Sequence, residues 1–364
     1  MLLIFLLGLV VLVNSIYYVF FSTFLFHRGR KRSESAQFPV SVLICAKNEM
    51  QNLSKHIPLW LAQDYPNFEL ILINDASSDN TLEIMNHFAD SDPRIKVVDV
   101  ENNEAFWGSK KYALTLGIKK ASNKRMLFTD ADCRPASGSW ITHMASNFSE
   151  EKQIILGYGA YDKKPGLLNA LIRFETLITA LQYFSYAYNG IPYMGVGRNL
   201  AYTSNLFYAN KGFTAHMNVR SGDDDLFVNQ AATSTNTSLQ YHPDSFTYSI
   251  PKKSWGSWIK QKKRHSSTAK FYKPKHKFLL GTYYVFNLLF WIIAISALLF
   301  YNWKITLPIL LSRFLIQYVV CAKAARKFNE LGLVVFIPLL ELFLVCVQLF
   351  IFISSRKSKQ HPWK

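Results

Sequence analysis

The sequence predicts an α/β domain with a mainly parallel central sheet, carried between membrane-spanning helices. Three observations predict this fold class. Strand and helix signals alternate from residue 40 to residue 130, and long apolar runs lie towards both ends of the chain. The segment between these runs, about residues 33 to 277, is polar and long enough for one substantial core. Strands that alternate with helices are joined by crossovers, which give parallel pairing.

The alternating segment is read as a series of short apolar strands, each followed by a helix. The predicted strands are Val40–Ala46, Phe68–Ile73, Ile95–Val100 and Met126–Thr129, and the predicted helices are Met50–Leu61, Thr81–Ala89 and Lys110–Ala121. Ligands of such sheets lie beyond the carboxyl ends of the strands. The residues that follow each strand are therefore the expected binding site.

Residues 1–26 are a predicted transmembrane anchor. Nearly every residue from Leu2 to Phe26 is apolar, and about 20 apolar residues span the hydrocarbon core of a bilayer. The alternative is a cleaved signal peptide, which requires basic residues before a short apolar core. Here the basic residues follow the apolar run, in a basic linker at residues 27–38. Because basic flanks stay inside, the domain after the linker is expected in the cytoplasm, at the plasma membrane.

The chain closes with further apolar runs within residues 278–354, which supply two or three membrane segments. These runs are Phe278–Phe300, Ile305–Ala322 and Leu331–Ser354. Three crossings would place the basic tail, residues 355–364, outside the cell, against the charge rule. Two crossings would keep the tail inside but leave one run re-entrant or interfacial. The sequence leaves this choice open, and Arg313 and Glu341 within the runs, costly in lipid, are candidates to pair.

The net charge of +17 and the aromatic residues among the lysines of residues 251–277 point to a membrane surface. Nucleic-acid binding is another interpretation of a basic chain. The basic clusters adjoin apolar runs, however, so anionic headgroups are the expected partner and no nucleic acid is expected. Residues 251–277 are accordingly a predicted interfacial amphipathic segment. The four cysteines form no CxxC pair, which indicates neither a zinc site nor a disulfide framework.

Acidic residues at two strand ends are candidates for a cation site. Asp130 and Asp132 follow the fourth predicted strand, and Asp75 follows the second. Exposed carboxylates suit Mg²⁺ or Mn²⁺, although an acidic turn that caps a helix is the alternative. Lys110 opens a predicted helix, where it could face phosphate or lie on a solvated surface.

Two later segments complete the candidate site. In Asp223–Asp225, like-charge repulsion should raise at least one carboxyl pKa, which suits a general base, although two of the three could merely cap the helix that follows. A tyrosine-rich stretch, Tyr183 to Tyr202, could form a pocket for sugar and acceptor. Within it we select Arg198 and Asn199 as binding residues.

Seven segments occur in a fixed order along the chain: AKNE, NDASSDNT, GSKKYALTLG, TDAD, GVGRNLAY, SGDDDLF and QKKRH. In this order they resemble family 2 glycosyltransferases, whose catalytic domain has the GT-A nucleotide-sugar-binding fold. The resemblance covers about residues 39 to 265 and implies a GT-A domain at residues 39–250. The flanking membrane segments look like those of ceramide-glucosyltransferase-type and polysaccharide-synthase-type members.

The resemblance implies a role for individual residues. Asp224 matches the catalytic base, and Asp132, with Asp130 near it, matches the ligand of a divalent metal, Mg²⁺ or Mn²⁺. The residues implied to bind the nucleotide or its diphosphate are Lys47, Asn48, Glu49, Asp75, Lys110, Gln261 and Arg264. Gln261 and Arg264 belong to the motif QxxRW, in which His265 here replaces tryptophan. Asn74 and Ala76 also replace the commoner aspartate and glycine of the second motif.

The implied activity is metal-dependent, inverting transfer of a sugar from a nucleotide sugar, by analogy a UDP-sugar. The acceptor would be a lipid-borne or glycan hydroxyl at the cytoplasmic membrane face. Because the missing tryptophan helps to stack the acceptor sugar in chain-building synthases, His265 favours one transfer per encounter. A processive polysaccharide synthase is the first alternative. A non-catalytic, membrane-anchored nucleotide-sugar-binding protein is the second.

Overall fold

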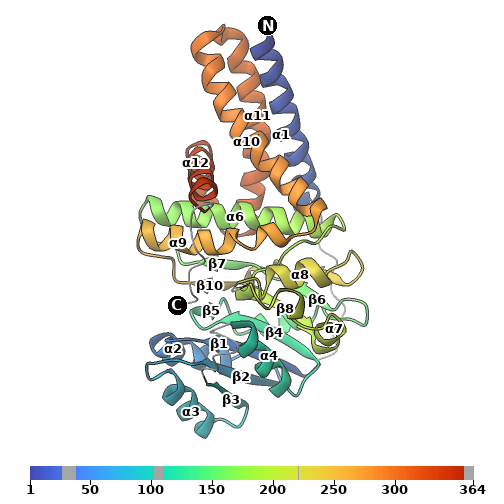
Figure 1. Cartoon of the computed structure of the whole chain (residues 1–364), viewed down its shortest axis with the longest axis vertical. Coiled ribbons are helices and arrows are strands. Elements are labelled where there is room, and N and C mark those ends of the chain that lie inside the picture. Colours follow the sequence, from blue (N-terminus) through green and yellow to red (C-terminus); the bar gives the residue numbers. More distant parts are fainter. Residues whose placement is uncertain (27–37, 102–109, 220, 356–364) are drawn as a thin grey trace. The chain divides into compact units, whose positions relative to one another are not determined.

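The computed structural model describes residues 1–26, 38–101, 110–219 and 221–355, and it divides into two compact units (Figure 1). Within these ranges, the first unit contains residues 1–26, 163–189 and 253–355. The second unit contains the remaining described residues. Most of the predicted basic linker and of the basic tail lies outside the described residues.

The second unit is built on a twisted sheet of seven strands among the described residues, in the order β3-β2-β1-β4-β8-β6-β9. The strands are β1 Val40–Ala46, β2 Phe68–Asp75, β3 Ile95–Val100, β4 Arg125–Asp130, β6 Ile154–Leu156, β8 Leu200–Thr203 and β9 Thr237–Leu239. The first four are parallel, β8 is antiparallel to both of its neighbours, and β9 pairs in parallel with β6. The predicted mainly parallel α/β sheet is therefore confirmed.

Helices cover this sheet, and a small second sheet extends it. The helices of the second unit are α2 Met50–Leu61, α3 Thr81–Ser91, α4 Lys110–Lys120, α5 Trp140–Ala145, α7 Ser204–Ala209 and α8 Asp225–Ala231. The small sheet has the order β5-β10-β7, formed by Cys133–Pro135, Thr247–Ser249 and Gly159–Tyr161. Its strand β5 follows directly on the Asp130–Asp132 turn, so the small sheet fixes the far side of that turn.

The predicted strands and helices are present at their predicted places, because the apolar pattern that predicted them is also the core. Every residue of β1 and β2 is buried, and apolar side chains of α2 and α5, among them Trp60 and Trp140, pack on the strands. The two indole rings meet edge to face, with centroids 4.8 Å apart. Two elements run two residues further than predicted: α3 ends at Ser91, and β2 ends at Asp75 because Asp75 still pairs with Val100 of β3.

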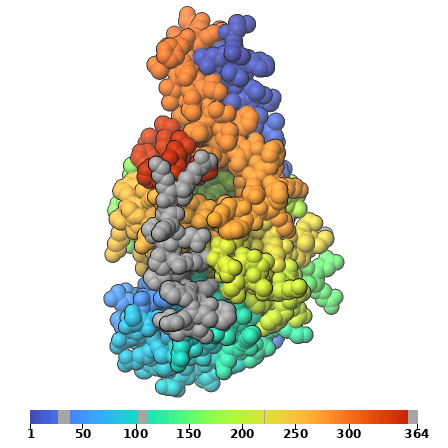
Figure 2. Space-filling model, viewed as in Figure 1, coloured from blue at the N-terminus to red at the C-terminus, as the bar shows by residue number. Residues whose placement is uncertain are grey.

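The first unit is a helical assembly. Its helices are α1 Leu2–Phe26, α6 Leu167–Tyr188, α9 Trp255–Ser266, α10 Pro274–Phe300, α11 Trp303–Lys327 and α12 Ile337–Ser355. Figure 1 shows α1, α10 and α11 packed lengthwise, and Figure 2 shows the blue surface of α1 beside the orange surface of α10. Among the described residues, four segments are long and apolar enough to cross a membrane: Leu2–Phe26, Pro274–Phe300, Trp303–Lys327 and Leu331–Ser354.

Residues 163–189 belong to the first unit, whereas the sequence boundaries 39–250 place them in the catalytic domain. The segment forms α6, whose buried apolar side chains pack against α1 and α12. Phe184 stacks on Phe24 at 5.3 Å, and Arg173 forms an ion pair with Glu330. The sequence analysis missed this helix because it lies in mid-chain and because Asn169, Arg173 and Glu175 interrupt its apolar run.

A polar cluster joins the helices inside the first unit. Arg313 of α11, which is fully buried, donates from Nη1 and Nη2 to the two carboxylate oxygens of Glu341 on α12, each at 2.7 Å. Nη2 also donates to Asn287 of α10 at 3.1 Å, and the hydroxyl of Tyr18 on α1 donates to Glu341 at 3.0 Å. The predicted Arg313–Glu341 pair therefore exists, and it ties four helices together.

Candidate active site

The strand register of the second unit aligns the predicted site segments at one edge of the sheet. Cys45 of β1 pairs with Asp130 of β4, and Ala46 pairs with Asn74 of β2. The turns that leave β1, β2 and β4 therefore start at the same level. These are the turns that carry Lys47–Glu49, Asp75 and Asp130–Asp132.

The turns after β1 and β2 are interlocked by hydrogen bonds. Asn48 has a φ of 56°, a left-handed conformation that asparagine tolerates better than most residues. Its Oδ1 accepts the backbone N–H of Ser78 at 2.8 Å, and its own N–H donates to Ser77 Oγ at 3.1 Å. The N–H of Glu49 donates to Thr81 Oγ1 at 2.9 Å. Asn48 and Glu49 thus shape the predicted nucleotide pocket through bonds within the protein.

Asp75 lies at the base of these turns and is only 3% exposed. The neighbouring Asn74, which replaces the family's aspartate, donates from Nδ2 to Asp99 Oδ1 at 2.7 Å. Its Oδ1 accepts the N–H of Ser77 at 3.3 Å. The asparagine therefore braces the turn from inside. Lys47, the first residue after β1, is half-buried.

The Asp130–Asp132 turn brings together atoms that suit a metal ion. One carboxylate oxygen each of Asp130 and Asp132, together with the Cys133 sulfur, lie within 4.8 Å of one another. Cys133 is buried, and its sulfur is a soft donor that Mg²⁺ and Mn²⁺ disfavour in comparison with oxygen. The two carboxylates remain as hard oxygen donors. They fit Mg²⁺ or Mn²⁺, which bind few protein carboxylates together with phosphate oxygens.

Lys110 of α4 bridges two acidic segments that are distant in the sequence. Its Nζ lies 2.7 Å from Asp130 Oδ1 and 3.0 Å from Asp223 Oδ2. Burial opposes the charge of Lys110, but Asp130 and Asp223 outweigh it and hold its pKa well above the ordinary range. Lys111 has a different role, because its Nζ donates to the backbone carbonyls of His216 and Val219 at 2.7 and 2.8 Å.

Asp224 is oriented by two backbone amides. The N–H of Gly197 donates to Oδ2 at 2.6 Å, and the N–H of Asp225 donates to Oδ1 at 2.8 Å at the start of α8. Each carboxylate oxygen keeps a further lone pair for a substrate hydroxyl. Burial, followed by repulsion from Asp223 and Asp225, raises the pKa of Asp224 to about 7, against the opposing effect of Lys110. A carboxylate with this pKa can exchange protons near neutral pH.

Two residues of the Asp223–Asp225 triplet cap a helix, as the capping alternative predicted, but the third forms an ion pair. Asp224 caps α8 and the Oδ1 of Asp225 accepts the N–H of Leu226, as a capping role requires. Asp223, which received no role from the sequence, completes the charge bridge with Lys110. Only its position next to Asp224 could have signalled this role.

Arg198 and Asn199 belong to a short 3-10 helix, Gly197–Asn199, which contacts the end of β4 through the bond from Thr129 Oγ1 to the Arg198 carbonyl. The Arg198 guanidinium donates to the Ala160 carbonyl at 3.0 Å and lies 4.2 Å from the centroid of the Tyr161 ring. Burial lowers its pKa, but Tyr161 and the nearby acidic groups outweigh burial and raise it. Arg198 therefore keeps a positive charge close to the turn that follows β4.

Asn199 is placed as a core brace, which argues against its predicted contact with substrate. It has no exposed surface, and its Nδ2 donates to the carbonyls of Tyr158 and Ser245 at 2.9 and 2.7 Å. Its Oδ1 accepts the indole N–H of Trp140 at 3.1 Å. A Cβ at Gly157 would lie 2.5 Å from its Cγ, so glycine is required there. These bonds use the amide within the core.

A small cavity joins most of these groups. Its lining residues are Lys110, Leu114, Phe128, Thr129, Asp130, Gly197, Leu200, Tyr202, Asp223 and Asp224. The candidate base, the charge bridge and Asp130 of the predicted metal-binding turn therefore share one concave site in the second unit. Gln261 and Arg264 lie on α9 of the first unit, so their contact with a diphosphate stays a prediction.

Comparisons with known proteins agree with this geometry. Residues 41–205 match the model of glycosyl transferase family 2. The poly-beta-1,6-N-acetyl-D-glucosamine synthase of Staphylococcus epidermidis is 38% identical over 123 residues, covering 33% of this chain and 29% of that protein. The UDP-Glc:alpha-D-GlcNAc-diphosphoundecaprenol beta-1,3-glucosyltransferase of Escherichia coli is 28% identical over 125 residues, covering 34% and 45%. The chain therefore spans less than half of the length of either relative.

The fold agrees with a solved structure. The mannosyltransferase of Pyrobaculum calidifontis, solved in complex with GDP-Man and Mn²⁺, superposes with a TM-score of 0.59 at 15% identity, covering 93% of this chain and 99% of that one. The sheet and its acidic strand ends have the GT-A fold that is found in glycosyltransferases. More specifically, residues 41–205 are the part of the chain that is similar to glycosyl transferase family 2, and they contain most of the seven sequence segments.

Proposed function

We propose that this protein transfers a sugar from a nucleotide sugar, most simply a UDP-sugar, to a lipid-borne or glycan hydroxyl, with inversion at the anomeric carbon. The observation that carries the proposal is the shared cavity of Asp224, Lys110 and Asp130, three charged groups drawn from separate segments. The chemistry needs a base for the acceptor, charge stabilisation for the leaving diphosphate and shelter from water. The first two requirements have candidates among the described residues, Asp224 for the base and Lys110 for the positive charge.

The transfer can be written with these residues. Asp224 accepts the proton of the acceptor hydroxyl while the acceptor oxygen forms a bond to the anomeric carbon. The bond from that carbon to the diphosphate breaks, and the nucleoside diphosphate leaves with the electron pair. Lys110 and Arg198 supply fixed positive charge near the leaving group. A divalent ion held by Asp132 and Asp130 would add Lewis-acid stabilisation of the diphosphate when bound.

The metal requirement gives a direct prediction. We expect chelation to abolish transfer and added Mn²⁺ or Mg²⁺ to restore it. We expect Asp132→Asn to raise the metal concentration for half-maximal activity at least tenfold, because one of two carboxylate ligands is lost. The measurement is initial rate against metal concentration, with Asp162→Asn as the matched control. Asp162 pairs with Arg134 at 2.8 Å and does not line the cavity. Full activity in excess chelator would contradict the prediction.

The raised pKa of Asp224 predicts the pH dependence of transfer. The base must be ionised, so kcat/KM should be constant above pH about 7 and fall about tenfold for each unit below it. Activity falls at low pH because a carboxyl group that is already protonated cannot accept the proton of the acceptor hydroxyl. An ordinary aspartate, with a pKa of about 3.9, would leave kcat/KM flat down to pH about 5. A profile that is flat between pH 5 and 8 would therefore contradict the raised pKa of Asp224.

The identity of donor and acceptor is tested with membranes that contain the protein and a panel of labelled nucleotide sugars. Lipids and polymers are then extracted separately. We expect one labelled lipid or short glycan carrying a single added sugar, because His265 replaces the stacking tryptophan. The relative from Staphylococcus epidermidis, whose name describes a polymer synthase, favours the alternative outcome, a ladder of polymers. Absence of transfer with every donor, together with intact donor binding, would support the non-catalytic alternative.

We also propose a membrane arrangement in which α12 does not cross. Figure 1 shows α12 almost end-on while α1, α10 and α11 lie lengthwise, and α12 packs on α6 and α9. Two C-terminal crossings, α10 and α11, then keep the basic tail on the cytoplasmic side with the catalytic domain, as the charge rule favours. Tags at the two ends of the chain test this. We expect an N-terminal tag to be labelled on intact cells and a C-terminal tag only after permeabilisation; labelling of both on intact cells would mean three crossings.

A further inference from the structure

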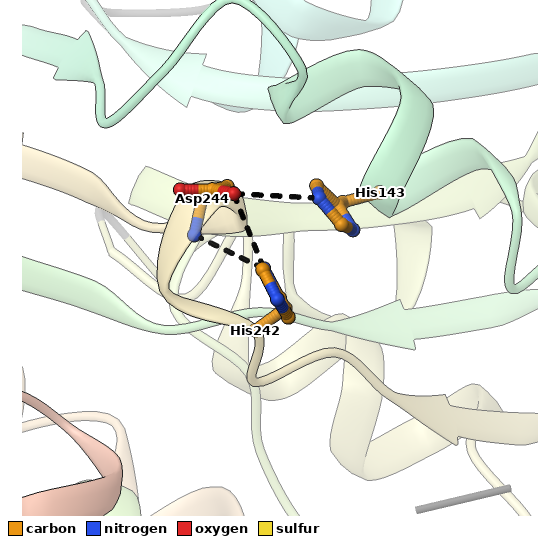
Figure 3. Close-up of side chains that lie close together, drawn as sticks. All are labelled: His143, His242 and Asp244. Atoms are coloured by element: carbon orange, nitrogen blue, oxygen red, sulfur yellow. Dashed lines mark hydrogen bonds and ion pairs between the residues drawn. The ribbon is translucent and has the colours of Figure 1, made fainter. Parts of the chain in front are cut away.

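A cluster of two histidines and one aspartate lies in the second unit, apart from the residues that line the cavity. His143 is on α5, and His242 and Asp244 flank Pro243, which starts the short 3-10 helix η4, Pro243–Ser245 (Figure 3). Asp244 Oδ2 lies 3.6 Å from His242 Nδ1 and 3.9 Å from His143 Nε2. One ligand atom from each residue lies within 4.8 Å of the other two. The transfer mechanism uses none of these side chains.

The cluster is held in place by the surrounding chain. The two imidazole rings are stacked, with centroids 4.3 Å apart and planes 14° apart. Gln240 donates from its side chain to the His143 carbonyl, and the hydroxyl of Ser137 donates to the Asp244 carbonyl at 3.0 Å. The hydroxyl of Ser245 donates to the His242 carbonyl at 2.6 Å. The backbone on both sides of the cluster is therefore fixed before any ligand binds.

We propose that His143, His242 and Asp244 form a second metal site, selective for Zn²⁺ or a similar transition-metal ion. Two imidazole nitrogens and one carboxylate oxygen are a known ligand set for such ions, whereas Mg²⁺ and Mn²⁺ prefer oxygen. Ligand atoms at about 2.0–2.2 Å around a tetrahedral ion lie about 3.4 Å apart. The separations from Asp244 Oδ2 to the two imidazole nitrogens, 3.6 and 3.9 Å, are close to this value, and the stacked rings would turn so that both nitrogens face the ion. The bond from the Asp244 N–H to His242 Nδ1, at 3.4 Å, is long and is readily replaced by the ion.

The site would be open on one side. The side chains of His242 and Asp244 are 54% and 52% exposed, and that of His143 is 25% exposed. Water can therefore supply the fourth ligand. Without an ion, an exposed histidine–aspartate pair contributes little to stability, so ion pairing alone does not explain why three such groups converge.

The bound ion would tie α5 to the segment that leads into β10. β10 pairs with β5, the strand that follows the Asp130–Asp132 turn, and Ser249 Oγ lies 2.9 Å from Cys133 Sγ. The site would thus steady the small sheet behind the transfer site without touching substrate. We expect Zn²⁺ to raise the Tm of the protein rather than to replace the metal needed for transfer.

The test uses the full-length protein, purified in detergent and stripped of metal. Zn²⁺ binding is followed by calorimetry and elemental analysis, and bound Co²⁺ by its visible absorption. We expect Asp132→Asn to keep the high-affinity zinc and the double variant His143→Ala/His242→Ala to lose it. Asp244→Asn, at a half-exposed position, should weaken zinc at least tenfold while keeping the fold. His87→Ala, at an exposed histidine outside the cluster, is the matched control and should bind as wild type.

The possible results separate cleanly. Loss of one zinc equivalent and of the zinc-dependent rise in Tm in the double variant, with both kept in Asp132→Asn and His87→Ala, supports the site. Wild-type protein that binds no zinc, or zinc that is lost only with Asp132→Asn, overturns it. Equal zinc binding by wild type and by Asp244→Asn would also overturn it. None of these outcomes depends on sugar transfer, so the proposed function stands or fails separately.

Discussion

Replacement of Asp224 by asparagine is expected to lower kcat by about 10²- to 10⁴-fold, the usual contribution of a general base, with little change in the KM for the donor. Asparagine cannot accept the acceptor proton, yet it matches aspartate in size. Its Oδ1 can still accept one of the two backbone amides that hold the carboxylate, from Gly197 and Asp225. The predicted donor-binding residues lie in other segments, so the substitution does not change them and the KM for the donor should be retained.

Position as well as charge determines this effect. A Cβ added at Gly197 would lie 3.3 Å from Asp224 Oδ2, so the carboxylate is seated closely against the chain. Asp224→Glu should therefore also lose most of its activity, because the longer side chain cannot occupy the same position. The measurement is steady-state kinetics, with thermal unfolding to show that each variant is folded.

Asp162→Asn serves here as a matched control, because it also removes one carboxylate but at a position that does not line the cavity. We expect its kcat to stay within about twofold of wild type, as is usual for surface polar changes. Donor hydrolysis is measured alongside transfer. If Asp224→Asn transferred sugar as fast as wild type, Asp224 would not be the base. If neither protein transferred or hydrolysed any donor, the catalytic proposal itself would be wrong.

Much of the second unit could be predicted because its pattern is local. Each buried strand is a short apolar run, and the polar residues directly after it must leave the sheet at the same edge. Asp130 aligns with Cys45 across the β1–β4 pair for this reason. The convergence of Asp75, Asp130 and Lys110 near the strand ends therefore follows from strand order, which the βα alternation implies.

The remainder depends on contacts between distant segments, which periodicity does not contain. Nothing near Lys110 in the sequence indicates that Asp223, over a hundred residues away, is its second partner. Asn199 is a residue type that often binds substrate. Here Trp140 donates to its side chain and Gly157 packs against it, so the side chain holds core segments together instead. The helix α6 was missed because polar residues interrupt its apolar run, and its place in the first unit follows from its contacts with α1 and α12, which are distant in the sequence.

The second large effect is expected from the buried pair of Arg313 and Glu341. We expect Glu341→Leu to lower the free energy of unfolding by about 3–5 kcal/mol, because it leaves the buried Arg313 charge without a counter-ion. Arg313→Met should cost less, because a carboxyl left alone can take up a proton whereas a guanidinium cannot lose one. The Glu341 carboxyl would also keep its bonds from Gln317 at 2.8 Å and from Tyr18 at 3.0 Å.

The double variant Arg313→Met/Glu341→Leu distinguishes an ion pair from a general sensitivity of α11 and α12 to substitution. Two apolar side chains of similar length leave no unpaired charge, so we expect stability close to or above that of wild type. The measurement is unfolding in detergent, with Asp92→Asn as the control.

Asp92 pairs with Arg94 at the surface, where the side chains are 20% and 42% exposed, and this pair should contribute less than about 1 kcal/mol. If the double variant were as unstable as the sum of the single ones, α12 would be held by packing alone, and the polar cluster would not be what keeps α12 against the bundle.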